Sequence, residues 1–222
     1  LDECEFARMS IPPPAPKLYH IVHWDRLKPI VASNGLLSDV ELGLANPGTT
    51  IGMAEIKRRR MSLDISCYAD LRVGECVPFY FCPRSVMLYL LHRSNHPNLQ
   101  YRGGQDPIVH LQFDMHSVRE WAVKEGLRWC FTKANAGASY TEHYCDPGEM
   151  SLIDWQAVAS TQWSNPATKE AKQAEFLVEQ RVPWELVESI GVRTRVTAQQ
   201  VNGVLPTTGH RPPVAINSKW YY

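Results

Sequence analysis

Short strand patterns interleaved with short helical patterns predict an α+β domain. Runs of alternating β-branched and aromatic residues recur along the chain, beginning at 18–23. Between them, apolar residues recur at helical spacing, and Gly, Pro and Asn close the segments. No G-x-G-x-x-G motif follows a strand and no phosphate-binding P-loop is present, so neither usual nucleotide-binding fold is indicated.

The order of these patterns gives the expected elements. Residues 1–17 contain four prolines and predict a surface arm, which leaves 18–222 as one domain. We expect strands at 18–23, 76–82, 108–113, 127–132, from 175, at 190–196 and at 214–217. We expect helices at 24–33, 51–61, 86–91, 117–125, 152–160, 183–189 and 198–205. Turn-forming residues predict loops at 36–50, around Asn46-Pro47-Gly48, and at 133–150.

Several boundaries have a local reason. Asn34-Gly35 would end the helix at 24–33 as a C-cap, and Gly126 would end the helix at 117–125. Pro83 would take the first position of the helix that follows the strand at 76–82, where its missing N–H is not needed.

The composition is that of a globular protein with a proper core. The 222 residues are 44% hydrophobic and 21% charged. Lys and Arg number 23 and Asp and Glu 23, so nucleic-acid binding would need a local basic patch. The six cysteines show neither C-x-x-C nor zinc-finger spacing and predict buried or free thiols in a reducing compartment, with a disulfide pair left open. No apolar run has the length of a membrane span and no signal peptide is indicated, so we expect a cytoplasmic protein.

A carboxylate stands at the start of one strand pattern. Ala174, Phe176 and Val178 share one face of that strand, and Glu175 shares the other with Leu177. A carboxylate held between buried neighbours is rigid and can place one hydrogen bond well. The pattern alone favours an edge-strand acid that faces water, so other residues must decide.

Basic residues mark two further places. Four of them occupy 57–60, which usually means a solvated charged surface, but Arg60 shares a helical face with Met53 and Ile56. The strand-to-helix junction from Tyr80 to Arg84 would aim free backbone N–H groups at one point and form an anion site. Alternatively, Arg84 only caps or covers the strand.

Other clusters indicate little chemistry. His20 and His23 lie three apart on a strand, face opposite sides and cannot ligate one metal together. Asp154 with Glu170 and Lys172 loosely matches the acid and E-x-K pattern of metal-dependent nucleases. That pattern needs a strand where this sequence has the composition of a helix, so a nuclease remains only an alternative and no metal is expected.

A strand histidine, an inward-facing arginine, the strand-to-helix anion site at Tyr80 and Arg84, and a rigid glutamate could together hold a dinucleotide. Motifs along the chain resemble the DarT family of DNA ADP-ribosyltransferase toxins. The resemblance covers roughly 18–222, with the motifs in the family's order. They are Tyr19-His20-Ile21-x-His23, Pro78-Phe79-Tyr80-Phe81-Cys82-Pro83-Arg84-Ser85-x-Met87-Leu88-Tyr89, Gly103-Gly104-Gln105-x-Pro107-Ile108, Gln173-Ala174-Glu175-Phe176-Leu177-Val178 and Trp220-Tyr221-Tyr222.

The resemblance implies an ADP-ribosyltransferase fold, in which two small packed β-sheets enclose an NAD cleft, with peripheral helices. It implies NAD as co-substrate and transfer of ADP-ribose onto a base of single-stranded DNA, thymine in the most similar subgroup. Guanine, RNA or protein remain alternative acceptors. As enzyme classes, it implies a glycosyltransferase (pentosyltransferase) and, more loosely, a nucleotidyltransferase. It also implies the toxin of a toxin–antitoxin system, whose partner is a macrodomain antitoxin of the DarG kind.

The resemblance also implies the roles of individual residues. Glu175 and Arg60 would be catalytic. NAD would be bound by His20, Ile21, His23, Leu36, Tyr80 and Arg60, and DNA by Lys57, Arg84, Met87, Tyr89 and Arg93. Tyr140 and Trp163 would be stacking platforms for a single strand, or core residues.

Two steps of the reaction need a residue each. Glu175 would hydrogen-bond the ribose 2′-hydroxyl and stabilise the positive charge that builds on the ribose. The acceptor base must lose a proton, and Arg60 would stabilise the deprotonated base, because a guanidinium with a pKa above ~12 is a poor base. A relay of the proton to Glu175 is the alternative.

Overall fold

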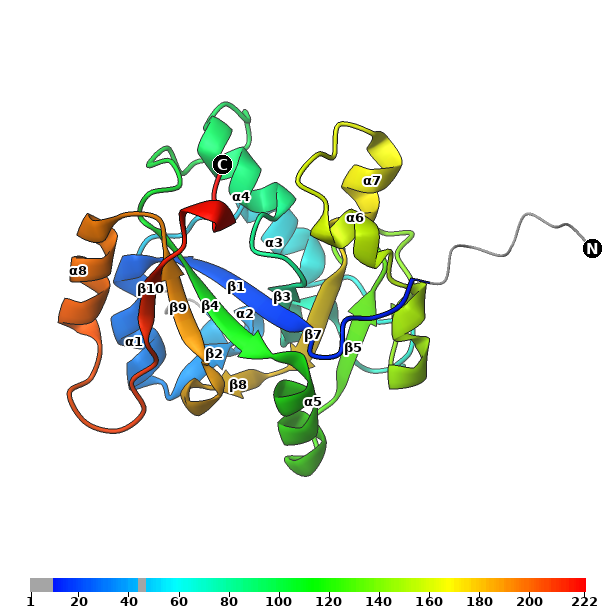
Figure 1. Ribbon diagram of the computed structural model, residues 1–222. Coiled ribbons are helices and arrows are strands. Elements are labelled where there is room, and N and C mark those ends of the chain that lie inside the picture. Colours follow the sequence, from blue (N-terminus) through cyan, green and yellow to red (C-terminus); the bar gives the residue numbers. More distant parts are fainter. Residues whose placement is uncertain (1–9, 44–46) are drawn as a thin grey trace, which may run out of the picture.

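The computed structural model describes residues 10–43 and 47–222. The expected α+β class is confirmed. Within these ranges an eight-stranded sheet, a two-stranded sheet and eight α-helices make up the fold (Figure 1). Residues 1–9 of the expected arm and Asn46 of the expected turn lie outside the described residues.

The large sheet is mixed and has the strand order β10-β9-β4-β1-β3-β7-β5-β6. Only β10 and β9 pair in parallel among the described strands of this sheet. The strands are β1 (Lys17–His23), β3 (Cys76–Tyr80), β4 (Ile108–Asp114), β5 (Trp129–Thr132), β6 (His143–Tyr144), β7 (Glu175–Glu179), β9 (Ser189–Val192) and β10 (Val214–Ile216); the small sheet pairs β2 (Gly35–Leu37) with β8 (Arg181–Pro183).

The large sheet consists of two halves with a narrow junction. β1 pairs with β4 over its whole length, and β3 pairs with β7 over its whole length. In the described chain β1 and β3 meet at a single pair, Tyr19 opposite Tyr80. In place of the two small sheets that we expected, the strands form one eight-stranded sheet made of two four-stranded halves that are joined at this pair.

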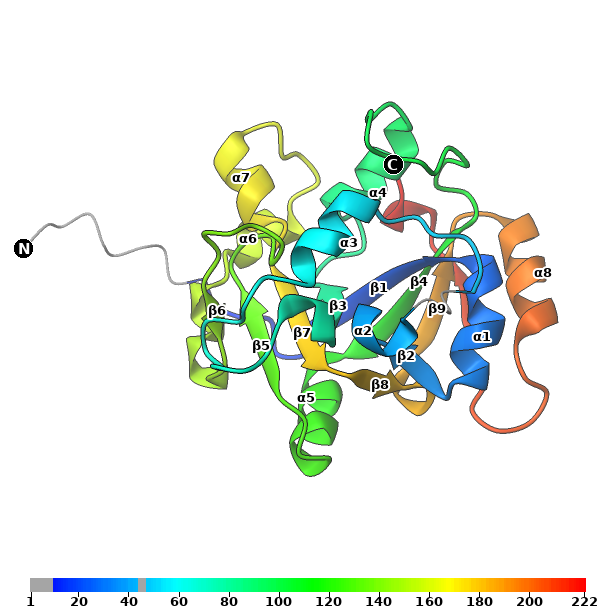
Figure 2. The ribbon, with the colours of Figure 1, turned by 180° about the vertical axis from the view of Figure 1, so that it is seen from behind.

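The helices surround the sheet. α3 and α2 lie in front of it in Figure 2, on the side of the β1–β3 junction, whereas α1 and α8 lie side by side next to the β9–β10 edge. The α-helices are α1 (Leu27–Ala32), α2 (Asp39–Leu42), α3 (Ala54–Arg60), α4 (Val86–Arg93), α5 (Met115–Lys124), α6 (Trp155–Ala159), α7 (Pro166–Ala171) and α8 (Arg195–Val204); five 3₁₀ turns, η1 (Trp24–Arg26), η2 (Val73–Glu75), η3 (Pro147–Leu152), η4 (Trp184–Leu186) and η5 (Ser218–Trp220), complete the described chain.

Three local predictions are wrong. The expected loop at 36–50 contains the end of β2 and helix α2, because the buried Ser38 hydroxyl caps α2 by accepting the Glu41 N–H at 3.2 Å. The expected loop at 133–150 contains β6 and η3. The expected helix at 183–189 shrinks to η4, because the residues before it pair as β8 with β2.

The alternation predicted for the strand that begins at Glu175 is confirmed. Ala174, Phe176 and Val178 are buried in the main core, where the Phe176 ring stacks on Trp129 with 5.5 Å between ring centroids. Leu177 belongs to a separate cluster on the other face. Buried side chains on both faces fix β7, so the direction in which its first residue points is set by the core.

Two expectations from composition can be compared with the fold. The five cysteines in the described part of the chain are free. No helix among the described residues is long and apolar enough to cross a membrane.

Candidate active site

A cleft of about 260 Å³ lies between α3 and the β1–β3 junction. Side chains of both half-sheets reach it: His20, Ile21 and Val22 from β1, Pro78 and Tyr80 from β3, and Glu175 from β7. Helix α3 contributes Ile56, Lys57 and Arg60; Asn135 comes from the turn after β5, and Gln173 from the segment that leads into β7. Residues from distant parts of the sequence therefore converge on one cavity.

An ion pair closes the inner end of this cleft. Arg60 Nη1 donates to both carboxylate oxygens of Glu175, at 3.2 and 3.0 Å, and the two side chains are only 11% and 3% exposed. Burial by itself would lower the pKa of Arg60, but the neighbouring Glu175 carboxylate outweighs it and raises that pKa. The Arg60 guanidinium therefore stays charged, and its helical face does point inward as its spacing with Met53 and Ile56 predicts.

One nitrogen of this guanidinium has no partner. Arg60 Nη2 is buried and makes no hydrogen bond within the described residues. A buried N–H donor without an acceptor costs free energy, so such donors are few in native proteins and are explained by a catalytic role or by a bound water or ion. Arg60 lines the cleft, so a ligand bound there is a candidate acceptor for this donor.

The Glu175 carboxylate is positioned by the backbone around it. The Ala136 N–H donates to Oε1 at 3.0 Å, so this oxygen accepts hydrogen bonds from both Ala136 and Arg60. The Glu175 N–H donates to Thr132 Oγ1 at 3.1 Å, and that hydroxyl donates to the Ala134 carbonyl at 2.6 Å. These bonds tie β7 to the turn after β5 and hold the carboxylate in one orientation.

His20 presents a neutral ring to the cleft. Burial lowers the pKa of His20 to about 4. Its Nδ1 lies 2.8 Å from the Pro78 carbonyl, so Nδ1 carries the proton and donates, which leaves Nε2 as an acceptor. A neutral imidazole of this tautomer accepts a hydrogen bond from a hydroxyl.

The cleft brings together part of the predicted NAD-binding set. His20, Ile21, Tyr80 and Arg60 line it. Leu36 does not line it; it is buried in β2, and its neighbour Leu37 reaches the cleft instead.

His23 does not line the cleft either. The strand alternation turns it to the opposite face, where its Nδ1 lies 3.0 Å from an Asp25 carboxylate oxygen. This placement agrees with the prediction that His20 and His23 face opposite sides.

The predicted DNA-binding set divides in the same way. Lys57 and Met87 line the cleft, and Lys57 pairs with Asp39 at 2.7 Å. Tyr89 packs edge-on against Trp163 at 4.9 Å between ring centroids, in an aromatic cluster away from the cleft. Arg93 is exposed at the end of α4. Tyr140 is exposed, and Trp163 is partly buried, so only Tyr140 has the free face that a stacking platform needs.

The strand-to-helix junction from Tyr80 to Arg84 does not aim free backbone N–H groups or Arg84 at the cleft. Ser85, not Pro83, precedes the first turn of α4, and its hydroxyl accepts the Leu88 N–H at 3.1 Å, so the helix caps itself. The Arg84 guanidinium lies over the Tyr222 ring, 4.3 Å from its centroid, and faces away from the cleft. Cation–π contact with the aromatic C-terminal segment decides its direction.

The nuclease pattern also lacks its geometry. Glu170 lies on helix α7, Lys172 directly after it, and Asp154 caps α6 by accepting the Ala157 N–H. No group of three or more metal-ligating side chains suited to an ion occurs in the described ranges.

Sequence reasoning assigned no role to several residues of the cleft. Asp39 and Arg26 line it from segments that were read as loop and helix, without a functional signal. Asn135 and Gln173 flank Glu175, and the Asn135 amide donates to Gln173 Oε1 at 3.3 Å. Gln173 belongs to the same sequence motif as Glu175 and lies two residues before it, so the motif could have identified Gln173 as a residue of the cleft.

Comparison with known proteins decides the family. A family model described as "ssDNA thymidine ADP-ribosyltransferase, DarT" matches residues 19–222. The chain belongs to the DarT family. A "DNA ADP-ribosyl transferase" of Thermus aquaticus is 35% identical over 212 residues, which cover 94% of this chain and 90% of the relative.

Solved DarT structures share the fold. "Thermus sp. 2.9 DarT in complex with ADP-ribosylated ssDNA" superposes with a TM-score of 0.86 at 33% identity, covering 96% of this chain and 99% of that one. "Thermus sp. 2.9 DarT in complex with NAD+" gives a TM-score of 0.79 at 31% identity, covering 96% of this chain and 100% of that one. The predicted family and the ADP-ribosyltransferase fold are confirmed.

The predicted enzyme class, an NAD-dependent DNA ADP-ribosyltransferase, is confirmed with the family. The looser class of nucleotidyltransferase is not supported. A DarT enzyme transfers a pentosyl group, ADP-ribose, and not a nucleotidyl group through its phosphorus.

Proposed function

We propose that this chain transfers ADP-ribose from NAD to the thymine base of single-stranded DNA, with Glu175 and Arg60 as catalytic residues. The buried Arg60–Glu175 pair beside an unpartnered guanidinium N–H is the observation that carries this proposal. The match to a family described by thymidine in single-stranded DNA supports the choice of base.

The cleft suits a dinucleotide chemically. Arg26 and Lys57 supply positive charge for a pyrophosphate, and Ile21 and Met87 supply apolar walls. His20 Nε2 accepts from a ribose hydroxyl, since Nδ1 is engaged with Pro78. Tyr80 lines the same wall; burial, together with the nearby Glu175 charge, raises the pKa of its hydroxyl, which therefore stays protonated as a donor.

Glu175 would stabilise positive charge in the cleft. NAD supplies a ribosyl–nicotinamide bond, whose cleavage builds positive charge on the ribose. One Glu175 oxygen, Oε1, already accepts from Arg60 and Ala136, whereas Oε2 accepts from Arg60 alone and keeps a free lone-pair direction. Oε2 is therefore the oxygen that would accept from the ribose 2′-hydroxyl. A fixed carboxylate in a water-poor site stabilises the developing charge without reorganising.

Arg60 would stabilise the acceptor base. Thymine N3 must lose its proton before it attacks, and the anion that forms needs a donor. Arg60 Nη2 is a charged donor with no other partner in the described chain, and the raised pKa of Arg60 excludes it as the base. The proton would leave through the Glu175 carboxylate or water.

Single-stranded DNA fits the surroundings of the cleft. A base must leave its stack to be modified, and a single strand makes this inexpensive. Arg58 and Arg59 are exposed on α3, beside Lys57 and Arg60, which reach into the cleft. These two side chains would contact phosphates while the base enters the cleft.

We also propose the wider setting that the family resemblance implies. The chain would act as the toxin of a toxin–antitoxin system in the cytoplasm, and a DarG-like macrodomain would remove the modification. Incubation of modified DNA with such a macrodomain should restore the unmodified mass. A modification that persists would argue against this partner.

A mass measurement tests the central proposal. The protein is incubated with NAD and a chelator, together with oligonucleotides that contain thymine or lack it. We expect a mass increase of one ADP-ribosyl group on thymine-containing single strands alone. Labelling of thymine-free, guanine-containing DNA, of RNA or of protein would show that this molecule, and not thymine, is the acceptor. Cleavage of the oligonucleotide without labelling would refute the transfer of ADP-ribose.

A further inference from the structure

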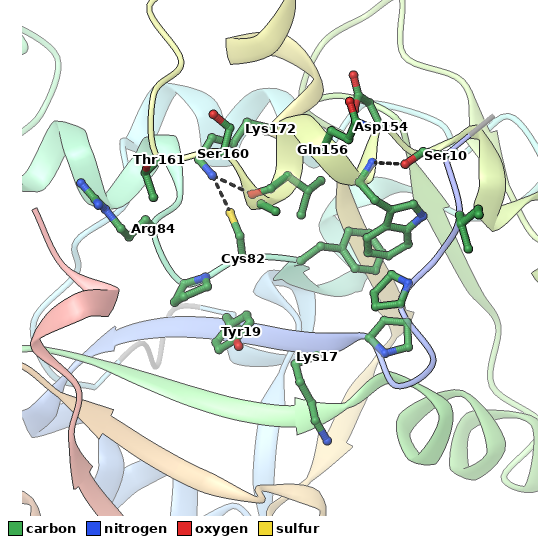
Figure 3. A pocket seen from close by; sticks show the side chains of 18 of the residues that line it. Ser10, Lys17, Tyr19, Cys82, Arg84, Asp154, Gln156, Ser160, Thr161 and Lys172 are labelled. Carbon is green, nitrogen blue, oxygen red and sulfur yellow. Dashed lines mark hydrogen bonds between the residues drawn. The ribbon is translucent and has the colours of Figure 1, made fainter. Parts of the chain in front are cut away.

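A second and larger cavity, of about 1210 Å³, lies on the other face of the β1–β3 junction (Figure 3). Tyr19 lines this cavity, whereas His20 lines the catalytic cleft. Consecutive strand residues point to opposite faces, so β1 separates the two cavities. Lys172 lines the second cavity and Gln173 the cleft, so the approach to β7 separates them as well.

Two features that the proposed activity leaves unused meet at this cavity. The first is the proline-rich arm, which lines one side of the cavity with Ser10, Ile11, Pro13, Ala15 and Pro16. The arm is held there by two hydrogen bonds of 3.1 Å, from the Ser10 N–H to the Ser151 carbonyl and from the Trp155 N–H to Ser10 Oγ. The second is Arg84, which does not face the cleft.

The cavity has a cationic end. Figure 3 shows Arg84, Ser160, Thr161 and Lys172 together at one end of it. Lys172 is 2% exposed, and its Nζ donates to the Val158 carbonyl at 2.7 Å and to Cys82 Sγ at 3.4 Å. Arg84 Nε is buried and has no hydrogen-bond partner in the described part of the chain.

These charges lack counter-charges. Within the described ranges, no carboxylate lies within ion-pair distance of Arg84, Lys172 or Lys219, all of which line the cavity. Lys17, at the far end, is different because Asp114 and Glu188 pair with it. A buried ammonium that contacts only neutral acceptors is expensive, so an anion brought by a ligand would be bound strongly here.

The rest of the cavity is mixed. Phe81, Trp155, Pro13 and Pro16 form an apolar wall beyond the cationic end, and Ser10, Asp154 and Gln156 also line the cavity. A ligand that matches both parts carries an anion at one end and a flat, weakly polar body at the other. A nucleotide has this form.

We propose that the second cavity binds a nucleotide, with its phosphate at Arg84, Lys172 and Lys219 and its base against the apolar wall. Two sources share this chemistry: a free nucleotide, and a nucleotide of the DNA strand that enters the cleft. Tyr80 in the cleft and Arg84 are four positions apart in the sequence, a span of at most ~14 Å along the chain. The two sites lie on opposite faces of the sheet, so ligands of different length test whether one strand reaches both. The DNA source rests on the proposed function, whereas the free-nucleotide source does not.

Binding measured without NAD tests this site. The variant R84Q/K219Q removes two of its charges, and K124Q/R195Q, at exposed positions of α5 and α8 that line neither cavity, is the matched control. The ligands are a labelled single strand of about 12 nucleotides, within the range that one single-strand binding domain covers, a thymine trinucleotide and free thymidine monophosphate.

If the nucleotide belongs to the DNA strand, R84Q/K219Q should bind the long strand about tenfold more weakly. The slope of log affinity against log salt concentration should fall in magnitude by about 0.7 for each phosphate that is no longer neutralised. Binding of the trinucleotide should stay unchanged. For the free nucleotide, the binding of thymidine monophosphate disappears instead. Ala159→Phe, which fills the cavity from an exposed wall position without removing charge, should reproduce either result. If both variants bind all three ligands like the control, the proposal is overturned. Failure of the proposed function is seen separately, as wild-type protein that binds DNA but never labels it with NAD.

Discussion

Replacement of Glu175 by glutamine separates the proposed catalytic role of this residue from its structural one. Glu175→Gln keeps the shape of the side chain but leaves the Arg60 guanidinium as a buried cation without its carboxylate. We expect two losses. Transfer of ADP-ribose should fall at least about 10³-fold, because a fixed charge that stabilises the transition state disappears. The protein should also become less stable.

The size of the stability loss follows from burial. Removing one partner of a buried ion pair costs about 3–5 kcal/mol, because the other charge stays desolvated. Arg60 and Glu175 are 11% and 3% exposed, so this range applies to them. Glu188, which pairs with Lys17 and is 41% exposed, is the control: Glu188→Gln should cost less than about 1 kcal/mol.

Urea unfolding and labelling of a thymine-containing oligonucleotide measure the two losses. The double variant Arg60→Met/Glu175→Gln removes both charges and should regain most of the stability while remaining inactive. If Glu175→Gln keeps activity within about tenfold of the wild type, the catalytic assignment is refuted. If its stability equals that of Glu188→Gln, the buried pair does not have the energy that its geometry implies.

Three further predictions follow from the same region and its surroundings. Arg60→Ala should reduce transfer to DNA far more than it reduces NAD binding measured by calorimetry; equal losses would assign Arg60 to co-substrate binding. Thr132→Val should cost about 1–3 kcal/mol in urea unfolding, because the buried Glu175 N–H loses its acceptor, whereas Thr168→Val on α7 should not. Burial lowers the pKa of His110 from 6.5 to about 4, so the unfolded chain binds more protons in this window and stability falls as pH falls through it, by about 1.4 kcal/mol per pH unit. His110→Gln should flatten the slope of unfolding free energy against pH and the exposed His116→Gln should not; unchanged slopes in both would contradict the buried neutral state.

The sequence predicted the elements whose signal is local. The strand after Glu175 could be predicted because residues on both of its faces are buried, which gives a continuous apolar run after one acid. Arg60 could be predicted because its spacing from Met53 and Ile56 is a property of one helix. The short α2 was missed because a single buried Ser38 cap forms it among turn-forming residues.

The rest of the site depends on contacts that no local pattern carries. The direction of Arg84 is set by the Tyr222 ring, 138 residues further along the chain. The support of Glu175 by the Ala136 N–H comes from the turn after β5, which reads as an ordinary loop. Such partners are brought together by the sheet order, and a residue pattern does not report it. Motif resemblance indicated candidate residues for the site but not the residues that contact them.

The hydrogen bond of His20 links the geometry of the two half-sheets to the tautomer of its ring. Glu175 and Tyr80 belong to the half that contains β3 and β7, whereas His20 belongs to the half that contains β1 and β4. The halves pair at one residue, Tyr19 with Tyr80, and the His20 Nδ1–Pro78 hydrogen bond crosses the same junction at 2.8 Å. This bond also fixes the tautomer that leaves Nε2 as an acceptor. A shift of one half against the other would therefore break the hydrogen bond that fixes the tautomer of His20. The proposed ribose-binding acceptor, Nε2, thus depends on the two halves keeping the geometry that brings His20 and Glu175 into one cleft.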